Sequence, residues 1–372
     1  MRIAISTGGG DAPGLNSVIR SATLAALQRG WDVIGIRDGF NGLMFPEEYI
    51  ESGGTIKLTR EFVRGIGHLG GTVLGSTNRG NPCAYPVQLE DGTWTTVDRT
   101  EELVGLFRAA GIDALITIGG DGSLVIGQRL SEAGLRVIGV PKTIDNDLLM
   151  TDATFGFDTA VGVATESIDR LFTTATSHSR VFVVEVMGRY SGWIALNAGM
   201  AAGAHAILIP EIPFDLEHVA AMIARRAARG ARFAIVVVAE GARPAGGERS
   251  VIGQSVGQAE RLGGMGAFVA SELERLTGKE TRTMVLGHLL RGGTPTSLDR
   301  LLGLRFGTAA VRGLELGHRG VMVALDPPNV NFVPLLSAVA SLRTVPLNCD
   351  TILAGRDLAI SFGDQWPPTS PN

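Results

Sequence analysis

Short runs of consecutive apolar residues alternate along the chain with longer segments that have helical periodicity. The apolar runs predict strands buried on both faces, and the longer segments predict helices between them. This alternation predicts an α/β fold with mainly parallel sheets. The predicted strands are 2–6, 31–36, 113–119, 136–140, 181–186, 204–210, 233–241, 283–289 and 320–325, and the clearest helices are Leu15–Gln28, Thr159–Ala175, Leu216–Arg229 and Gly264–Thr277.

The length of 372 residues favours two domains. The segment 47–100 is less regular than its surroundings and reads as a loop-rich excursion. We expect a domain boundary near Thr154–Asp158. The tail 366–372 contains three prolines and is expected to be mobile.

Composition narrows the classes of partner. The net charge is -4, so the chain lacks the general basic character that attracts nucleic acid. Its two cysteines, Cys83 and Cys349, are far apart and argue against a disulfide framework and for a reducing compartment. A strand follows Met1 directly, which leaves no room for a signal peptide, and no apolar run is long enough to span a membrane. We expect a soluble, cytoplasmic protein with no nucleic-acid or membrane partner.

A carboxylate stands among glycines where the predicted strand 113–119 ends, in the sequence GGDGS at 119–123. Glycines let a polyphosphate approach the backbone, and Asp121 is well placed to coordinate Mg²⁺, which prefers carboxylate, water and phosphate oxygens. A capped strand-to-helix turn is the alternative interpretation. We favour the phosphate and metal site.

A second glycine-rich turn, Gly8–Gly14, follows the first predicted strand. It suits a phosphate, but Asp11 can equally be a turn or capping residue. The turn matches neither the dinucleotide fingerprint nor the P-loop. On its own this motif is weak.

The sequence VPKTIDNDL at 140–148 places two carboxylates, Asp145 and Asp147, separated by one residue, after another predicted strand. Such a pair is costly unless a cation offsets it or one member stays protonated. One carboxylate can act as a general base while the other orients it or the waters of a metal ion. A solvated turn is the alternative.

Arginines gather near other predicted strand ends. Arg189 suits a phosphate because its planar fork binds two oxygens, and Glu240 suits sugar hydroxyls. We expect every such motif at or near the carboxyl ends of the strands, where parallel sheets bind ligands. A phosphate donor site with Mg²⁺ and a pocket for a phosphorylated substrate together predict a phosphoryl transferase. The cations assigned to the second pocket are Arg180, Arg282, His288 and Arg291.

These motifs resemble those of the 6-phosphofructokinase family, and within it the mixed-substrate subgroup. The resemblance covers most of the chain, from Gly8 to Gly293, with a further match near the C-terminus. The motifs are specific in combination. The matching stretches are GGGDAPGLN, GGTVLGSTNRGNP, IGGDGS, PKTIDNDL, VEVMGRYSGW, VVVAEG, VLGHLLRGG and LRTVPL.

The resemblance implies two Rossmann-like domains with the active site in the cleft between them. Residues 1–156 and about 290–340 would bind the phosphoryl donor, and about 157–289 and 341–365 the sugar phosphate. It implies a glycolytic kinase that transfers the γ-phosphoryl group of ATP to the 1-hydroxyl of fructose 6-phosphate with Mg²⁺. A homodimer or homotetramer with active sites at subunit interfaces is also implied, Arg180 and Arg282 reaching across from a neighbour.

The resemblance also assigns roles by position. Asp145 would be the general base beside Thr143, with Asp147, Lys142 and Arg189 also catalytic. Asp121 would bind the metal. The donor would contact Gly10, Arg79, Gly80, Gly120, Asp121, Gly122 and Ser123, and the sugar phosphate Thr143, Asp145, Arg180, Met187, Gly188, Arg189, Glu240, Arg282, His288 and Arg291.

Three departures from the family pattern bear on these expectations. Gly122 is typical of ATP users because it leaves space for the α-phosphate, whereas Lys142 is typical of pyrophosphate users; we give Gly122 more weight. An arginine that bridges donor and acceptor phosphates in many bacterial relatives is shifted by one position here, to Arg79. At effector positions where charged groups are expected, the chain has Leu24, Phe172, Ala231 and His205, although Arg20 remains, so we expect weak or absent regulation by ADP and phosphoenolpyruvate.

These residues leave other functions open. Pyrophosphate-dependent transfer and a non-catalytic sugar-phosphate sensor are the main alternatives. Lipid and NAD kinases share a GGDG loop but have no reason to carry PKTIDND and the arginine set. A nicotinamide dehydrogenase is disfavoured by the missing fingerprint.

Overall fold

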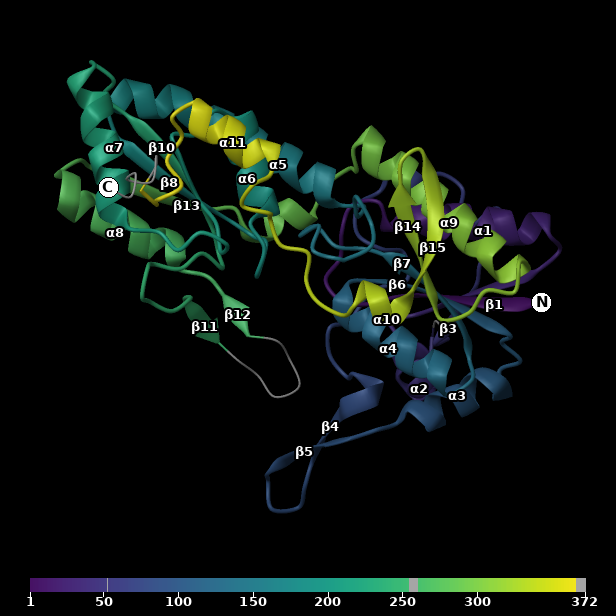
Figure 1. The fold of residues 1–372 in the computed structure, drawn as a ribbon. Coiled ribbons are helices and arrows are strands. Elements are labelled where there is room, and N and C mark those ends of the chain that lie inside the picture. Colours follow the sequence, from purple (N-terminus) through teal and green to yellow (C-terminus); the bar gives the residue numbers. More distant parts are fainter. Residues whose placement is uncertain (52, 254–259, 366–372) are drawn as a thin grey trace. The chain divides into compact units, whose positions relative to one another are not determined.

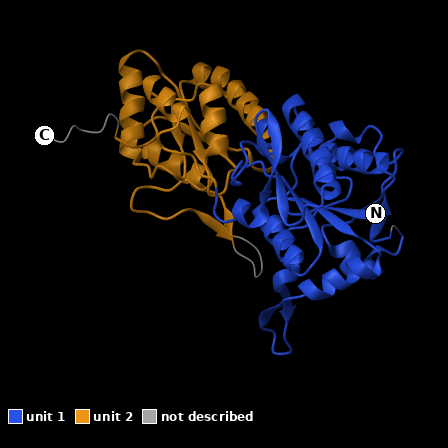
Figure 2. Ribbon diagram, turned by 45° about the vertical axis from the view of Figure 1, so that its right-hand side comes forward, with its two compact units in different colours: residues 1–159, 255–259, 291–342 blue, residues 160–254, 260–290, 343–372 orange. Residues whose placement is uncertain are grey.

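The computed structural model of this chain describes residues 1–51, 53–253 and 260–365. Two compact units can be distinguished (Figure 2). Unit 1 comprises residues 1–159, 255–259 and 291–342, and unit 2 comprises 160–254, 260–290 and 343–372. The chain passes between the units near residues 159, 290 and 342.

Unit 1 is built on a seven-stranded sheet. From one edge strand to the other, its strands are β15 (Asn329–Pro334), β14 (Val321–Asp326), β7 (Arg136–Pro141), β6 (Ala114–Gly119), β1 (Arg2–Thr7), β2 (Asp32–Ile36) and β3 (Thr55–Lys57). The central strands β1, β2, β6, β7 and β14 are parallel, and only the two edge strands, β3 and β15, pair antiparallel. The predicted mainly parallel sheet is confirmed. Because parallel strands share one direction, their carboxyl ends lie along a single edge of the sheet.

Helices cover both faces of this sheet (Figure 1). On one face, Ile3 and Ile5 of β1 pack in one core with residues of α1 and α9, among them Leu15 and Phe306. On the other face, Ala4 of β1 belongs to a second core with α3 and α4. Successive strand residues point to opposite faces, so a run of consecutive apolar residues is required to fill both cores.

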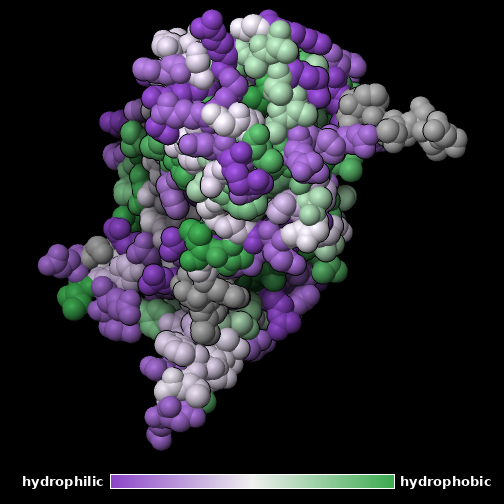
Figure 3. Space-filling model, turned by 90° about the vertical axis from the view of Figure 1, so that its left-hand side faces the viewer, coloured by the Kyte–Doolittle hydropathy of each residue, from purple (hydrophilic) through white to green (hydrophobic). Residues whose placement is uncertain are grey.

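Unit 2 has a four-stranded parallel sheet in the order β13-β8-β10-β9. Strands β8 and β10 are buried along their whole length. Strand β13 lies at the edge of the sheet and exposes Met284 and Val285. Seen from one side, the molecule has polar residues interspersed with smaller apolar areas (Figure 3).

Most predicted elements are confirmed, and helix α1 has the predicted bounds. The predicted strand 283–289 is wrong in its second half: β13 ends at Val285, and a short 3-10 helix begins at Gly287. Within 47–100, β3 and the β4–β5 hairpin were not anticipated, nor was β15. These strands are short, exposed or antiparallel, so they lack the continuous apolar run that identifies a buried parallel strand. The tail 366–372 lies outside the described residues.

In the order of the chain, the strands are β1 Arg2–Thr7, β2 Asp32–Ile36, β3 Thr55–Lys57, β4 Tyr85–Gln88, β5 Trp94–Val97, β6 Ala114–Gly119, β7 Arg136–Pro141, β8 Val181–Val186, β9 Ala206–Leu208, β10 Ala234–Ala239, β11 Val251–Gly253, β12 Arg261–Leu262, β13 Thr281–Val285, β14 Val321–Asp326 and β15 Asn329–Pro334. The helices are α1 Leu15–Gln28, α2 Asn41–Met44, α3 Thr100–Ala109, α4 Asp121–Glu132, α5 Phe157–His178, α6 Trp193–Ala201, α7 Leu216–Ala228, α8 Met265–Thr277, α9 Ser297–Glu315, α10 Leu335–Ala338 and α11 Asp350–Asp357.

An aromatic cluster occupies two of the positions where the family pattern led us to expect charged side chains that bind effectors. The rings of Phe172, His205 and Phe233 pack with centroids 5.5–5.9 Å apart. Nδ1 of His205 accepts a hydrogen bond from the backbone N–H of Ile235 at 2.9 Å. Burial, with the nearby charge of Arg226, lowers the pKa of His205 to about 4. The imidazole is therefore neutral in the folded protein.

This neutral histidine predicts a loss of stability in mild acid. The unfolded chain takes up a proton near pH 6.5, whereas the folded chain resists it down to about pH 4. The contribution of His205 is complete above pH 6.5 and is lost as the pH falls to 4. The pKa difference corresponds to about 3 kcal/mol of unfolding free energy, which solvent screening of the partly exposed ring reduces to about 2 kcal/mol. Urea unfolding across this range should show the loss in the parent protein and a flatter dependence in His205→Phe. Parallel curves for the two proteins would contradict the assignment.

Candidate functional site

The two glycine-rich turns of unit 1 meet around one side chain, Ser123, at the carboxyl edge of the sheet. Gly8 follows β1 and Gly119 ends β6, two neighbouring parallel strands. A Cβ on Gly8 would lie 2.7 Å from Oγ of Ser123, and a Cβ on Gly119 only 2.2 Å from its Cβ. Backbone N–H of Gly8 donates to the carbonyl of Ile118 at 3.0 Å. The glycines are therefore required for the close approach of the two turns.

Helix α4 begins at this point. Asp121 is its first residue and is exposed, and Gly120 caps the helix without a side-chain hydrogen bond. The first N–H groups of a helix lack partners within the helix and favour anions. A Cβ on Gly122 would meet nothing within 4 Å, so open space adjoins this helix end.

A neighbouring loop, 76–80, supports the first glycine turn and was not expected to contribute in this way. Backbone N–H of Gly9 donates to the carbonyl of Thr77 at 2.9 Å, and Oγ of Ser76 donates to the carbonyl of Gly9 at 2.5 Å. No local sequence signal identifies these contacts. Arg79 and Gly80, predicted donor contacts, are in the same loop; Arg79 is exposed, and within the described part of the chain its guanidinium makes no ion pair.

Two cations border Gly10. The buried ammonium group of Lys142 donates to the carbonyl of Gly10, and Nη1 of Arg291 donates to the carbonyl of Asp11 at 3.0 Å. A Cβ on Gly10 would lie 2.7 Å from Nη1 of Arg291. Burial and the charge of Arg291 lower the pKa of Lys142 to about 8. Arg291, predicted to bind the sugar phosphate, thus lies beside the first glycine turn.

The acidic loop after β7 is buried and tightly held. Oγ1 of Thr143 accepts a hydrogen bond from the backbone N–H of Asp145 at 3.0 Å and donates to Oδ1 of Asp147 at 3.1 Å. Asn146 has a positive φ of 52°, and its side chain accepts from the backbone N–H of Thr154 at 3.1 Å. Both carboxylates are at most 7 % exposed. A solvated decorative turn is therefore ruled out for this loop.

Three carboxylates influence one another here. Burial, together with the negative charges of Asp145 and Asp121, raises the pKa of Asp147 to about 7. Among the described residues, no group of three or more histidine, cysteine or acidic side chains forms an all-protein metal cage. Mg²⁺ usually takes one or two carboxylates and completes its shell with water and phosphate. Asp121 beside an open helix end and a repulsive carboxylate pair fits such an ion.

In unit 2, four predicted sugar-phosphate residues come together at the carboxyl ends of β8 and β10. Backbone N–H of Arg189 donates to Oε1 of Glu240 at 3.1 Å. Gly188 has a φ of 147°, and its Cβ would lie 2.6 Å from the carbonyl of Ser191. The sharp turn at Met187–Arg189 thus needs glycine at its centre.

Arg180 and Arg282 lie at the opposite edge of the same sheet. Arg180 precedes β8, and Arg282 is the second residue of β13, so both are at the amino ends of their strands. The expectation that every motif follows a strand is wrong for these two. Strand β8 has six residues that each rise about 3.3 Å, so its amino and carboxyl ends are roughly 17–20 Å apart.

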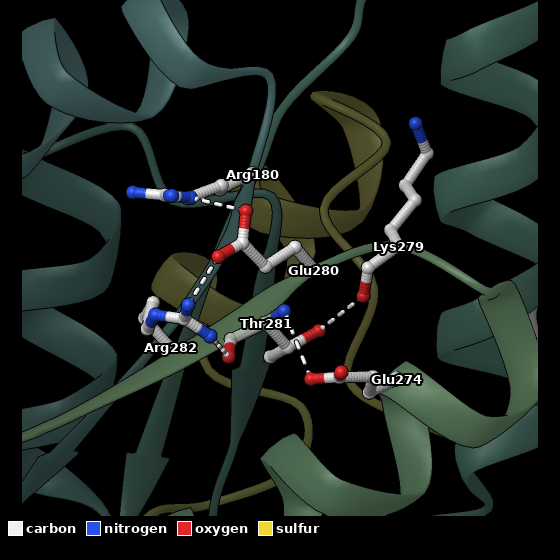
Figure 4. A network of polar contacts seen from close by, with 6 residues as sticks. All are labelled: Arg180, Glu274, Lys279, Glu280, Thr281 and Arg282. Carbon is white, nitrogen blue, oxygen red and sulfur yellow. Dashed lines mark hydrogen bonds and ion pairs between the residues drawn. The ribbon is translucent and has the colours of Figure 1, made fainter.

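A shared carboxylate joins these two arginines (Figure 4). Nε of Arg180 donates to Oε2 of Glu280 at 2.6 Å, and Arg282 pairs with the other oxygen. The hydrogen bond from Arg180 holds the pKa of Glu280 below its usual value. Glu280 was not among the predicted residues. It orients two guanidinium groups side by side.

Two further polar side chains, His288 and Glu185, lie near strand ends in unit 2. His288 is exposed in the 3-10 helix after β13. Glu185, a strand-end carboxylate like Glu240, is buried and accepts hydrogen bonds from the backbone N–H groups of Gly264 and Gly266 at 3.3 and 2.7 Å. It therefore caps the start of α8, an ordinary structural use of a carboxylate.

Fold and loops together define an α/β protein whose glycine-rich, carboxylate-bearing turns lie at the carboxyl edge of a parallel sheet. A family model described as phosphofructokinase matches residues 2–314. The chain is 50% identical over 364 residues to an ATP-dependent 6-phosphofructokinase of Chloroflexus aggregans, covering 98% of each chain. It is 47% identical over 354 residues to a pyrophosphate–fructose 6-phosphate 1-phosphotransferase of Amycolatopsis mediterranei, covering 93% of this chain and 97% of the relative. The chain belongs to the phosphofructokinase family, as its motifs predicted.

Solved structures agree on the fold. The phosphofructokinase of Pichia pastoris matches with a TM-score of 0.75 and 31% identity, covering 91% of this chain and 35% of that chain. A pyrophosphate-dependent phosphofructokinase of Marinobacter aquaeolei matches with a TM-score of 0.78 and 23% identity, covering 100% and 94% of the two chains. At 23% identity, the likeness to the Marinobacter aquaeolei structure concerns the fold alone. In the described residues no helix is long and apolar enough to cross a membrane.

The close approach around Ser123 predicts opposite effects for two alanine substitutions in one motif. Gly119→Ala places a methyl group against Ser123 and should cost about 1–3 kcal/mol of unfolding free energy. Gly122→Ala, in open space on a helix, should be neutral or stabilise by up to about 1 kcal/mol. Urea unfolding of both variants measures the difference. Ser123→Gly should rescue Gly119→Ala; equal stability of the two alanine variants would contradict the packing described.

Proposed function

We propose that this protein is an ATP-dependent 6-phosphofructokinase, which forms fructose 1,6-bisphosphate from fructose 6-phosphate in glycolysis. The observation that carries the proposal is the convergence of two glycine turns, the start of α4 and the buried acidic loop on one sheet edge of unit 1. Glycine turns suit the donor phosphates, and a buried carboxylate suits a proton acceptor. Unit 1 is accordingly assigned to the phosphoryl donor.

The proton transfer is assigned to Asp145. Its carboxylate takes the proton of the sugar 1-hydroxyl as that oxygen bonds to the γ-phosphorus of ATP, and the bond to the β,γ-bridging oxygen breaks to release ADP. Thr143 fixes the loop through its two hydrogen bonds, one to Asp145 and one to Asp147. Phosphoryl transfer depends mainly on positioning and charge neutralisation. Lys142, Arg291 and the N–H groups of α4 are available for that task.

A bound Mg²⁺ would neutralise charge on the donor phosphates. Asp121 is the residue proposed to hold it, and Asp147 to support it. Burial, and then repulsion from neighbouring carboxylates, raise the pKa of Asp147, and a divalent cation relieves the repulsion. The described residues offer few protein ligands, which agrees with an ion bound largely through phosphate and water.

The sugar phosphate is assigned to residues of unit 2. Met187, Gly188, Arg189 and Glu240 share one sheet edge, whereas Arg180 and Arg282 share the other. One unit 2 sheet therefore does not present both groups to the same ligand. We assign the two arginines to the active site of a second copy, in a homodimer or homotetramer. The exposed edge strand β13, with Met284 and Val285 on its surface, suits such a contact. Glycolysis places the enzyme in the cytoplasm.

Pyrophosphate as donor is the second candidate, and Lys142 favours it. Its ammonium group lies beside Gly10 and carries charge that a small, highly charged donor needs. Curated relatives at similar identity carry both names. We rank ATP first because the space beside Gly122 leaves room for an α-phosphate.

Initial rates of fructose 6-phosphate phosphorylation with Mg²⁺, comparing ATP and pyrophosphate on one preparation, test this proposal. Turnover with ATP supports it. Turnover with pyrophosphate alone shows that Lys142 sets donor choice. No turnover with either donor favours a non-catalytic sugar-phosphate sensor.

Gly122→Asp should weaken use of ATP in particular. The added carboxylate occupies open space, so the fold is kept, but it repels the α-phosphate of a nucleotide. We expect kcat/KM for ATP to fall about 10–100-fold, which corresponds to one unfavourable charge contact of roughly 1.4–2.8 kcal/mol. Gly122→Ala is the matched control and should retain most activity. An unchanged kcat/KM in Gly122→Asp would contradict the assigned place of the donor.

A further inference from the structure

A hollow of about 520 Å³ lies at the amino edge of the unit 1 sheet. Its walls come from three turns that lead from a helix into a strand: α3 into β6, α4 into β7, and α9 into β14. The glycine turns of the candidate site instead follow the carboxyl ends of β1 and β6. Because these strands are parallel, the hollow and the candidate site lie at opposite edges of one sheet.

The hollow is positively charged. Arg108, Arg136 and Arg319 line it, against one carboxylate, Asp113. Asp113 accepts a hydrogen bond from the backbone N–H of Arg2 at 2.7 Å. Within residues 1–51, 53–253 and 260–365, none of the three lining arginines forms an ion pair. No carboxylate of the described residues therefore lies within ion-pair distance of these three guanidinium groups.

Arginines near helix C-termini often only stabilise the helix through its dipole and its last carbonyl groups. This is the alternative explanation for the three arginines of the hollow. Arg108 reaches the carbonyl of Ala133 at 3.5 Å, which is long for a hydrogen bond. The contact of Arg136 is with Sδ of Met1 at 3.9 Å. Neighbouring Arg2, in contrast, donates to the carbonyl of Ala110 at 3.2 Å. The carbonyl groups at the helix ends therefore occupy few of the N–H donors of the three lining arginines, and most of these donors are available to a ligand.

The remaining walls suit a small molecule with an apolar part. Val104, Ile112 and Leu135 line the hollow and are themselves buried. Volumes of 300–1,000 Å³ are usual for small-molecule sites. One guanidinium group can bind two phosphate oxygens through two parallel N–H···O hydrogen bonds, and arginines recognise phosphate esters in this way.

We propose that this hollow is a second anion site, which binds a small molecule carrying a phosphate or diphosphate group. It is separate from the donor and sugar-phosphate sites, so it does not depend on the proposed reaction. Arg108, Arg136 and Arg319 bind the phosphate oxygens. The apolar floor accepts a ring or carbon chain attached to them.

Hydrogen exchange read by mass spectrometry on the full chain tests the proposal, with ADP and inorganic phosphate as separate probes. ADP should slow exchange in peptides covering 104–113, 134–136 and 317–319, in addition to the glycine turns. The double variant Arg136→Glu with Arg319→Glu should lose the slowed exchange in the peptides of the hollow and keep the slowed exchange in the glycine turns. Its apparent dissociation constant for this hollow should rise at least about tenfold, the usual effect of a lost charge-assisted contact.

Arg225→Glu with Arg229→Glu is the matched control, because both residues are exposed at the end of α7 in unit 2. It should leave protection of the hollow unchanged. Protection with phosphate as well as ADP means that the phosphate group suffices, and protection with ADP alone means that the ring is also recognised; both support the proposal. Protection confined to the glycine turns, or equal protection in the double variant and the parent, overturns it. If the double variant unfolds, Arg319→Gln alone gives the same comparison with a smaller effect.

Discussion

The close approach of two backbone turns around Ser123 is the constraint on which the unit 1 site depends. Gly8 and Gly119 lack the Cβ atoms that would collide with this side chain, so β1 and β6 can end side by side with their turns in contact. This arrangement brings the start of α4 beside the first glycine turn. Lys142 and the acidic loop join the same edge because β7 is the next parallel strand. The candidate site residues therefore come together at these strand ends because of the strand order and the placement of the glycines.

Much of this site could be predicted because its signals are local. Glycines after an apolar run mark a turn at a strand end, and Asp145 and Asp147 are separated by a single residue in the sequence. The support from Ser76 and Thr77 could not be predicted, since contacts between distant loops leave no local pattern. The fold was predictable where strands are continuous and apolar, and it was missed at β3 and β15, which pair antiparallel at the edges.

Unit 2 shows where reasoning from strand ends fails. Arg180 and Arg282 were grouped with Arg189 as phosphate ligands, yet the two sets lie at opposite edges of one sheet. The resemblance to the phosphofructokinase family implied that a neighbouring subunit supplies these two arginines, and the separation gives that expectation a physical reason. Glu280, found only through the structure, pairs with both guanidinium groups and keeps them oriented.

We propose that Asp145, in the buried acidic loop of unit 1, accepts the proton of the sugar hydroxyl that attacks a phosphoryl donor bound at the adjacent glycine turns. Asp145→Asn tests it most directly, since the side chain keeps its shape and loses its basicity. With fructose 6-phosphate and ATP, kcat should fall about 10²–10⁴-fold while the dissociation constant of ATP, measured separately, stays within about threefold. A kcat close to that of the parent protein would contradict the account.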